Sequence, residues 1–76
     1  MISEKKLLEI LLNSGVDVDV ATIGFDQKFN DIGLDSLDVF NFFSEIDSEL
    51  DITIADEDFS MLLTLNDLKD YLNKKI

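Results

Sequence analysis

The sequence predicts a small all-α fold in which three longer helices and one short helix form a bundle, with a long ordered loop between the first two. Two observations support this fold class: apolar residues recur at helical spacing, and 46% of the residues are hydrophobic, enough to supply a core. The 76 residues allow one small core, and without cysteine no disulfide can hold it together. We therefore expect residues 1–76 to form a single domain that packing alone stabilises.

The first helix is expected over residues 3–14. Ser3 suits the N-cap position, and Gly15 suits the stop after the last turn. Leucines at helical spacing give this helix a broad apolar face: Leu7, Leu8, Leu11 and Leu12.

Residues 16–34 are expected to form the long ordered loop. The alternation of apolar and polar residues over 16–20 suggests a strand, but a single short strand has no obvious partner in so small a chain. Loops of this length tend to be functional, and this one leads to Ser36. Several of its apolar residues are expected to pack onto the helices: Val20, Ile23, Phe25, Phe29 and Ile32.

The second helix is expected from Ser36 to Leu50, after a tight turn at Gly33. At about 100° per residue, the apolar residues share one arc: Val39, Phe42, Phe43, Ile46 and Leu50. Leu37 and Phe40 are expected to add apolar contacts. The opposite arc carries Asp38, Glu45 and Glu49, which form either a docking surface or a face that keeps the protein soluble.

The last two helices follow a short connector. A brief helix is expected next, with the acidic residues 56–58 in its first turn, where their charge suits the positive end of the helix dipole. The last helix begins at Thr64, whose hydroxyl precedes Asp67 by three positions in a variant of the capping box. Its buried face is expected to hold Leu65, Leu68, Tyr71 and Leu72, with Lys74 and Lys75 closing its negative end.

Ser36 lies at the junction of loop and helix, between the carboxylates of Asp35 and Asp38, in the segment Asp-Ile-Gly-Leu-Asp-Ser-Leu-Asp. Its hydroxyl has two interpretations. It is either the N-cap of the helix, which accepts a hydrogen bond from a backbone amide, or a serine that another enzyme modifies. These eight residues alone do not choose between the two.

Composition narrows the classes of function. With 17 acidic and 6 basic residues the net charge is −11, which repels nucleic acid and anionic membranes and favours partners with basic patches. The absence of histidine leaves metal binding to carboxylates and removes the commonest general base, which argues against independent catalysis. No stretch resembles a signal peptide or a membrane span. We therefore expect a soluble, cytoplasmic, monomeric protein that is not an enzyme and holds no metal.

The whole chain resembles the acyl carrier protein family. The resemblance rests on three segments in order: Phe29–Asp38 with its Gly-Leu-Asp-Ser-Leu, then Ile54–Asp58, and then Leu63–Leu65. In that family the serine of Asp-Ser-Leu carries a 4′-phosphopantetheine arm, which a phosphopantetheinyl transferase (holo-acyl carrier protein synthase) transfers from coenzyme A. The resemblance implies that Ser36 is the attachment residue, within a motif that includes Asp35 and Leu37.

The resemblance also implies a role in transport, since family members carry acyl groups as thioesters on the thiol of the arm. An acyl pocket is expected among Phe40, Phe43, Ile54, Phe59, Met61 and Leu62, although ordinary core packing explains Phe43 and Ile54 equally well. Met61 is favoured because its flexible thioether adapts to variable occupancy. Acyl-processing enzymes with basic patches are expected to dock on Asp35, Asp38, Glu45, Glu49 and Asp56.

Three departures from the family pattern favour a specialised carrier over a housekeeping one. Asn41 stands where housekeeping fatty-acid carriers usually have glutamate, and Ala55 replaces a usual proline. The second helix is also unusually aromatic, with Phe40, Phe42 and Phe43. The pathway stays open among fatty acid, lipid and polyketide-type biosynthesis.

Three alternatives are weighed against the carrier. A peptidyl or aminoacyl carrier usually has a less acidic surface. An unmodified acidic interaction module would use Ser36 only as a cap. A calcium-binding loop is suggested by Asp17 and Asp19, but Ala21 occupies the third ligand position and Lys28 the position of the bidentate glutamate.

Overall fold

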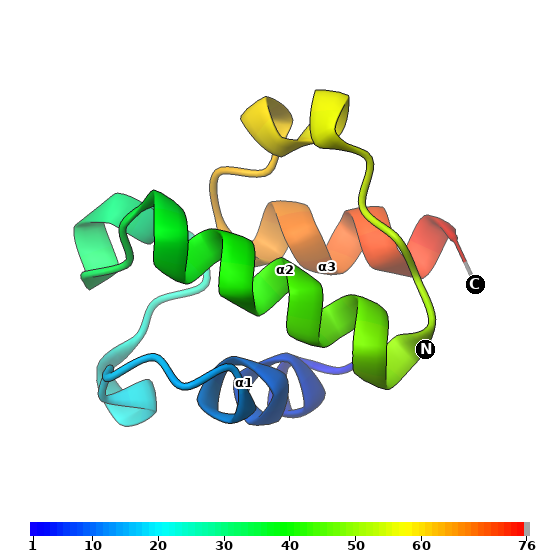
Figure 1. Ribbon diagram of the computed structural model, residues 1–76. Helices are drawn as coiled ribbons and strands as arrows, with labels where there is room; N and C mark the ends of the chain where they lie inside the picture. The colour runs from blue at the N-terminus through cyan, green and yellow to red at the C-terminus, as the bar shows by residue number, and fades with distance from the viewer. Residues whose placement is uncertain (76) are drawn as a thin grey trace.

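The computed structural model describes residues 1–75, apart from the side chain of Val20, and shows an all-helical bundle (Figure 1). Its α-helices are α1 (Glu4–Asn13), α2 (Ser36–Leu50) and α3 (Leu65–Lys74). Short 3-10 helices occur at η1 (Val20–Thr22), η2 (Phe29–Ile32) and η3 (Asp56–Met61). The predicted fold class is confirmed, with η3 as the brief helix before the last one. The sequence did not predict η1 and η2.

Side chains near the helix ends set where α1 and α3 begin. Ser3 caps α1 by accepting a hydrogen bond from the Lys6 amide at 3.1 Å, and the chain leaves this helix through Gly15, at φ +88°. Thr64 caps α3 by accepting from the Asp67 amide at 3.1 Å. The Asp67 carboxylate accepts in turn from the Leu63 amide at 3.2 Å, one residue before the cap, so this is a variant of the capping box, as predicted.

The loop over residues 16–34 is ordered by backbone hydrogen bonds to the segment before α3. The Phe29 amide donates to the Leu63 carbonyl at 3.0 Å, the Asn66 amide donates to the Phe25 carbonyl at 3.1 Å, and Lys28 and Thr64 form an isolated bridge. Phe29 is buried, whereas Ile23, Phe25 and Ile32 are half-buried against the core. The loop thus packs down as expected, and no strand forms among the described residues; the side chain of Val20 lies outside them.

The core lies between the three α-helices and is closed by aromatic rings. In Figure 1, α2 runs across the molecule with α1 on one side and η3 on the other. Each α-helix contributes three buried residues: Leu7, Ile10 and Leu11; Phe42, Phe43 and Ile46; Leu65, Leu68 and Leu72. The ring of Phe29 lies 6.4 Å from that of Phe42 and 6.2 Å from that of Phe43, both edge-on, so the loop is part of the core.

Some apolar residues that were expected to make core contacts lie outside the core. Leu37 is 66% exposed and Phe40 is 53% exposed, and Leu12 of α1 is exposed as well. In α2 the core takes the arc of Phe42, Phe43 and Ile46, which turns Leu37 and Phe40 toward solvent. No helix within residues 1–75 is both long enough and apolar enough to cross a membrane.

Candidate functional site

The turn before α2 fixes where this helix starts. Gly33 adopts φ +89°, a left-handed conformation that glycine takes without steric cost, and the next residue, Leu34, is buried. Asp35 is the N-cap: its carboxylate accepts from the Asp38 amide at 2.9 Å, and the Asp38 carboxylate accepts from the Asp35 amide at 3.3 Å. This reciprocal capping box makes Ser36 the first residue inside the helix, so the interpretation of Ser36 as the cap is wrong.

The Ser36 side chain therefore does not cap α2. It is exposed, and its hydroxyl makes no hydrogen bond to any of residues 1–75. The amides of the first helical turn and the helix dipole both favour negative charge at this end of α2. A phosphodiester on this oxygen would be exposed to solvent and stabilised by the helix, so the residues present suit a phosphate-linked group.

Replacing Asp35 by alanine is expected to lower the free energy of unfolding by about 1 kcal/mol, because the substitution removes the N-cap of α2. The measurement is chemical denaturation followed by circular dichroism. Asp17→Ala is the matched control, since Asp17 is exposed and caps no helix. Equal stabilities of the two variants would contradict the capping role.

An apolar groove with a volume of about 610 Å³ opens beside Ser36. It is lined by residues of the loop, of the first turns of α2 and of η3: Lys28, Phe29, Asn30, Leu34, Asp35, Ser36, Val39, Phe40, Phe59, Ser60, Leu62 and Leu63. The structure thus brings Phe40, Phe59 and Leu62 of the expected acyl pocket next to the serine. The loop residues in this lining were missed, because the backbone hydrogen bonds that carry the loop to α3 leave no mark in the sequence.

A smaller pocket of about 180 Å³ lies further along α2. Its lining includes Phe43 and Ile54, together with Phe40 and Phe59, so two more of the expected pocket residues are brought close. Met61 is the exception: it is 61% exposed and is absent from the lining of both cavities. The preference for Met61 is not supported, because the last turn of η3 directs its side chain into solvent.

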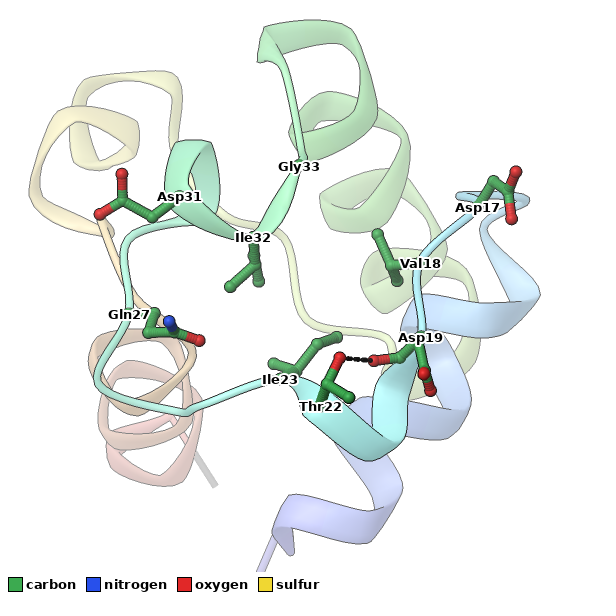
Figure 2. Close-up of a pocket in the computed structure, with 9 residues that line it drawn as sticks. All are labelled: Asp17, Val18, Asp19, Thr22, Ile23, Gln27, Asp31, Ile32 and Gly33. Atoms are coloured by element: carbon green, nitrogen blue, oxygen red, sulfur yellow. Dashed lines mark hydrogen bonds between the residues drawn. The ribbon is translucent and has the colours of Figure 1, made fainter.

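A third pocket, of about 390 Å³, lies among loop residues and is mostly polar (Figure 2). Figure 2 shows Asp17 and Asp31 on opposite sides of this pocket, while the Asp19 carboxylate accepts a hydrogen bond from the Ala21 amide at 3.0 Å. Across residues 1–75, no three acidic side chains gather closely enough to hold a metal ion.

The expected docking acids fall into two groups. Asp35 and Asp38 flank Ser36, and Asp56 is exposed at the start of η3. Glu49 instead contacts α1: its carboxylate accepts from the Asn13 amide group at 3.2 Å and lies 3.9 Å from the Lys6 ammonium. Glu45 is half-buried, and the burial raises the pKa of its carboxyl group; a hydrogen bond with Glu49 and the like charge of Glu49 raise this pKa further.

Replacing Glu45 by glutamine is expected to increase the stability of the protein at neutral pH. A raised pKa means that the folded state favours protonated Glu45, so its contribution to stability is full below the ordinary pKa of 4.5 and is lost as the pH rises through the folded value. The gain from Glu45→Gln should therefore disappear below that pH. Denaturation curves across the pH range test this, with Glu9→Gln, on the exposed face of α1, as the control.

Comparison with known proteins finds similar sequences over most of the chain. Residues 6–72 match the family described as "Phosphopantetheine attachment site". An acyl carrier protein of an Exiguobacterium species is 37% identical over 59 residues, which cover 76% of this chain and 75% of that protein. An acyl carrier protein of Onion yellows phytoplasma is 32% identical over 75 residues, which cover 97% of this chain and 96% of that protein.

A different kind of relative is a non-reducing polyketide synthase of Preussia isomera. It is 36% identical over 69 residues, which are 91% of this chain and only 3% of the synthase. The chain is therefore similar to one small part of a much longer protein. No solved structure was found to match the chain.

Proposed function

Since this chain belongs to the phosphopantetheine-bearing acyl carrier protein family, we propose that Ser36 carries the arm and that the protein shuttles acyl groups between biosynthetic enzymes. The observation that carries the proposal is the exposed Ser36 hydroxyl, which makes no hydrogen bond at the capped start of α2 and borders a largely apolar groove. The family's cofactor is covalent 4′-phosphopantetheine.

The roles of the individual residues follow from the geometry. The bound arm supplies the thiol on which acyl groups are held, a group that the chain lacks because it has no cysteine. Asp35 and Asp38 hold the first turn of α2 in place, so that its amides and dipole favour negative charge at Ser36. Phe40, Phe59 and Leu62 exclude water from the groove, where an apolar chain is sheltered. In this role the protein is a substrate of other enzymes and catalyses no step itself.

For the pathway, we propose a specialised branch of fatty acid, lipid or polyketide-type biosynthesis. Two facts support this proposal. The relatives include both free-standing acyl carrier proteins and a polyketide synthase, and Asn41 and Ala55 depart from the pattern of housekeeping carriers.

Partners are proposed to dock through exposed acids beside the two cavities, such as Asp35 at the groove. Asp47 and Asp56 both border the smaller pocket, whereas Glu49 forms an ion pair with Lys6 of α1. The proposed docking surface therefore lies closer to η3 than the sequence suggested. Each exposed ion pair contributes about 0.2–1 kcal/mol, which makes docking weak and sensitive to salt.

Asp56→Asn is accordingly expected to raise the KM for loading by the phosphopantetheinyl transferase severalfold at low salt, and the effect should fade at high salt. The control is Asp17→Asn. Asp17 lines the separate pocket among the loop residues, so this variant should be loaded as the native chain is. Equal KM values for the two variants at low salt would exclude Asp56 from the docking surface.

The function is tested by measuring intact mass before and after incubation with coenzyme A and a phosphopantetheinyl transferase. The expected result is the gain of one phosphopantetheinyl group, which fragmentation assigns to Ser36. A folded chain that never gains this mass would refute the carrier function and leave an unmodified interaction module as the better account.

A further inference from the structure

The groove beside Ser36 and the smaller pocket along α2 have two lining residues in common. Phe40 and Phe59 line both, one from α2 and one from η3. Beyond this pair, the lining of the groove includes Leu62 and Leu63, and the lining of the smaller pocket includes Phe43 and Ile54. Phe40 and Phe59 therefore lie at the boundary, here called the partition, between a cavity of about 610 Å³ and one of about 180 Å³.

Phe59 and Phe40, the two residues of this partition, differ in how closely they pack against the core. The Phe59 ring is half-buried and packs edge-on against Phe43, with the ring centroids 5.0 Å apart, and Phe43 is itself buried in the core. Phe40 is 53% exposed and pairs with no other aromatic ring among residues 1–75. Phe59 is thus the fixed side, and Phe40 has room to change its rotamer.

The position of Phe40 in α2 connects this partition to the modified serine. Phe40 follows Ser36 by four residues, so the two side chains lie on the same face of the helix, one turn apart. An apolar chain that starts at Ser36 and runs along this face meets the Phe40 ring before it reaches Phe43 and Ile54.

We propose that Phe40 is a specificity-determining residue, the movable side of a partition that limits the length of the acyl chain sheltered below Ser36. The inference rests on the proposed function and names its substrate class: straight, apolar acyl groups short enough to be contained in the groove. With the ring in place, longer chains project into solvent. With the ring removed, they continue into the smaller pocket.

The test uses the full chain loaded with straight acyl groups of increasing length, each transferred to Ser36 from the corresponding acyl coenzyme A. The readout is the Tm of each acylated form relative to the same variant with the bare arm. In the native chain Tm should rise with chain length and then level off, since each newly buried methylene shifts the equilibrium toward the sheltered chain by about fourfold. In Phe40→Ala the plateau should move to longer chains, and in Phe40→Trp to shorter ones.

Met61→Ala is the matched control, because Met61 is a similarly exposed apolar residue that lines neither cavity. It should keep the native plateau. Should Phe40→Ala be a poor substrate of the transferase, Phe40→Leu tests the same change with a smaller loss of surface.

The results separate this inference from the proposed function. Intact mass reports the loading of Ser36 by itself, and its absence in the native chain would refute the carrier function. Normal loading with the same plateau in the native chain, Phe40→Ala and Phe40→Trp would overturn the partition alone. A Tm that does not depend on chain length in the native chain would overturn it as well.

Discussion

The Ser36→Ala variant is expected to gain no phosphopantetheinyl group from coenzyme A under conditions in which the native chain is loaded to completion. The alanine side chain has no oxygen to form the phosphodiester, so the loss should be total. Stability should change by no more than about 0.5 kcal/mol, because the Ser36 hydroxyl caps nothing and alanine has the better helix propensity. Intact mass and chemical denaturation measure the two effects separately.

Ser60→Ala is the matched control for this experiment. Ser60 is an exposed serine that lines the same groove, but it lies on η3 and not at the start of an α-helix. It should be loaded as the native chain is. Mass gain in Ser36→Ala, or its loss in Ser60→Ala, would place the attachment elsewhere. A destabilisation of Ser36→Ala by more than about 1 kcal/mol would restore the capping role to this serine.

The Phe42→Ala variant is expected to lose about 3–5 kcal/mol of stability, the usual cost of removing a buried phenylalanine. Phe42 is fully buried, and its ring lies 6.4 Å from that of Phe29 and 6.1 Å from that of Phe43. The truncation therefore opens a cavity and removes a point where the long loop is held against α2. Domains of this size have about 5–15 kcal/mol in total, so Tm should fall by tens of degrees or cooperative unfolding should be lost.

Phe40→Ala makes the same chemical change two residues earlier in α2, and it should cost less than about 1 kcal/mol because Phe40 is half exposed. Urea denaturation of both variants gives the comparison. Similar losses of stability at the two positions would contradict the burial of Phe42 in the core and the exposure of Phe40 to solvent.

Much of the local structure could be predicted from the sequence because it depends on neighbours in the chain. The caps at Ser3 and Thr64 and the stop at Gly15 are short-range signals, and the predicted limits of α2, Ser36 and Leu50, match the structure. Ser36, the proposed attachment residue, stood out for the same reason, since its motif is continuous. The cap of α2 stayed open at this range, because Asp35 and Ser36 are both good N-cap residues and only the backbone conformation selects Asp35.

The groove could not be predicted in the same way because its walls come from segments far apart in the chain. Lys28, Asn30 and Leu63 border it only because the Phe29 amide donates to the Leu63 carbonyl and brings the loop to the start of α3. Met61 has the right chemistry for a pocket, but its place in η3 turns it outward.

Sequence alone thus determined the three α-helices, the short helix η3, the single core and the serine at the start of α2, all of which follow from periodicity, capping chemistry and one continuous motif. Tertiary packing decided the rest. It brought loop residues to the groove, drew Glu49 toward α1, and placed Phe40 and Phe59 where they line both cavities. Those outcomes depend on how helices rotate and dock against one another, which the spacing of residues along one helix does not specify.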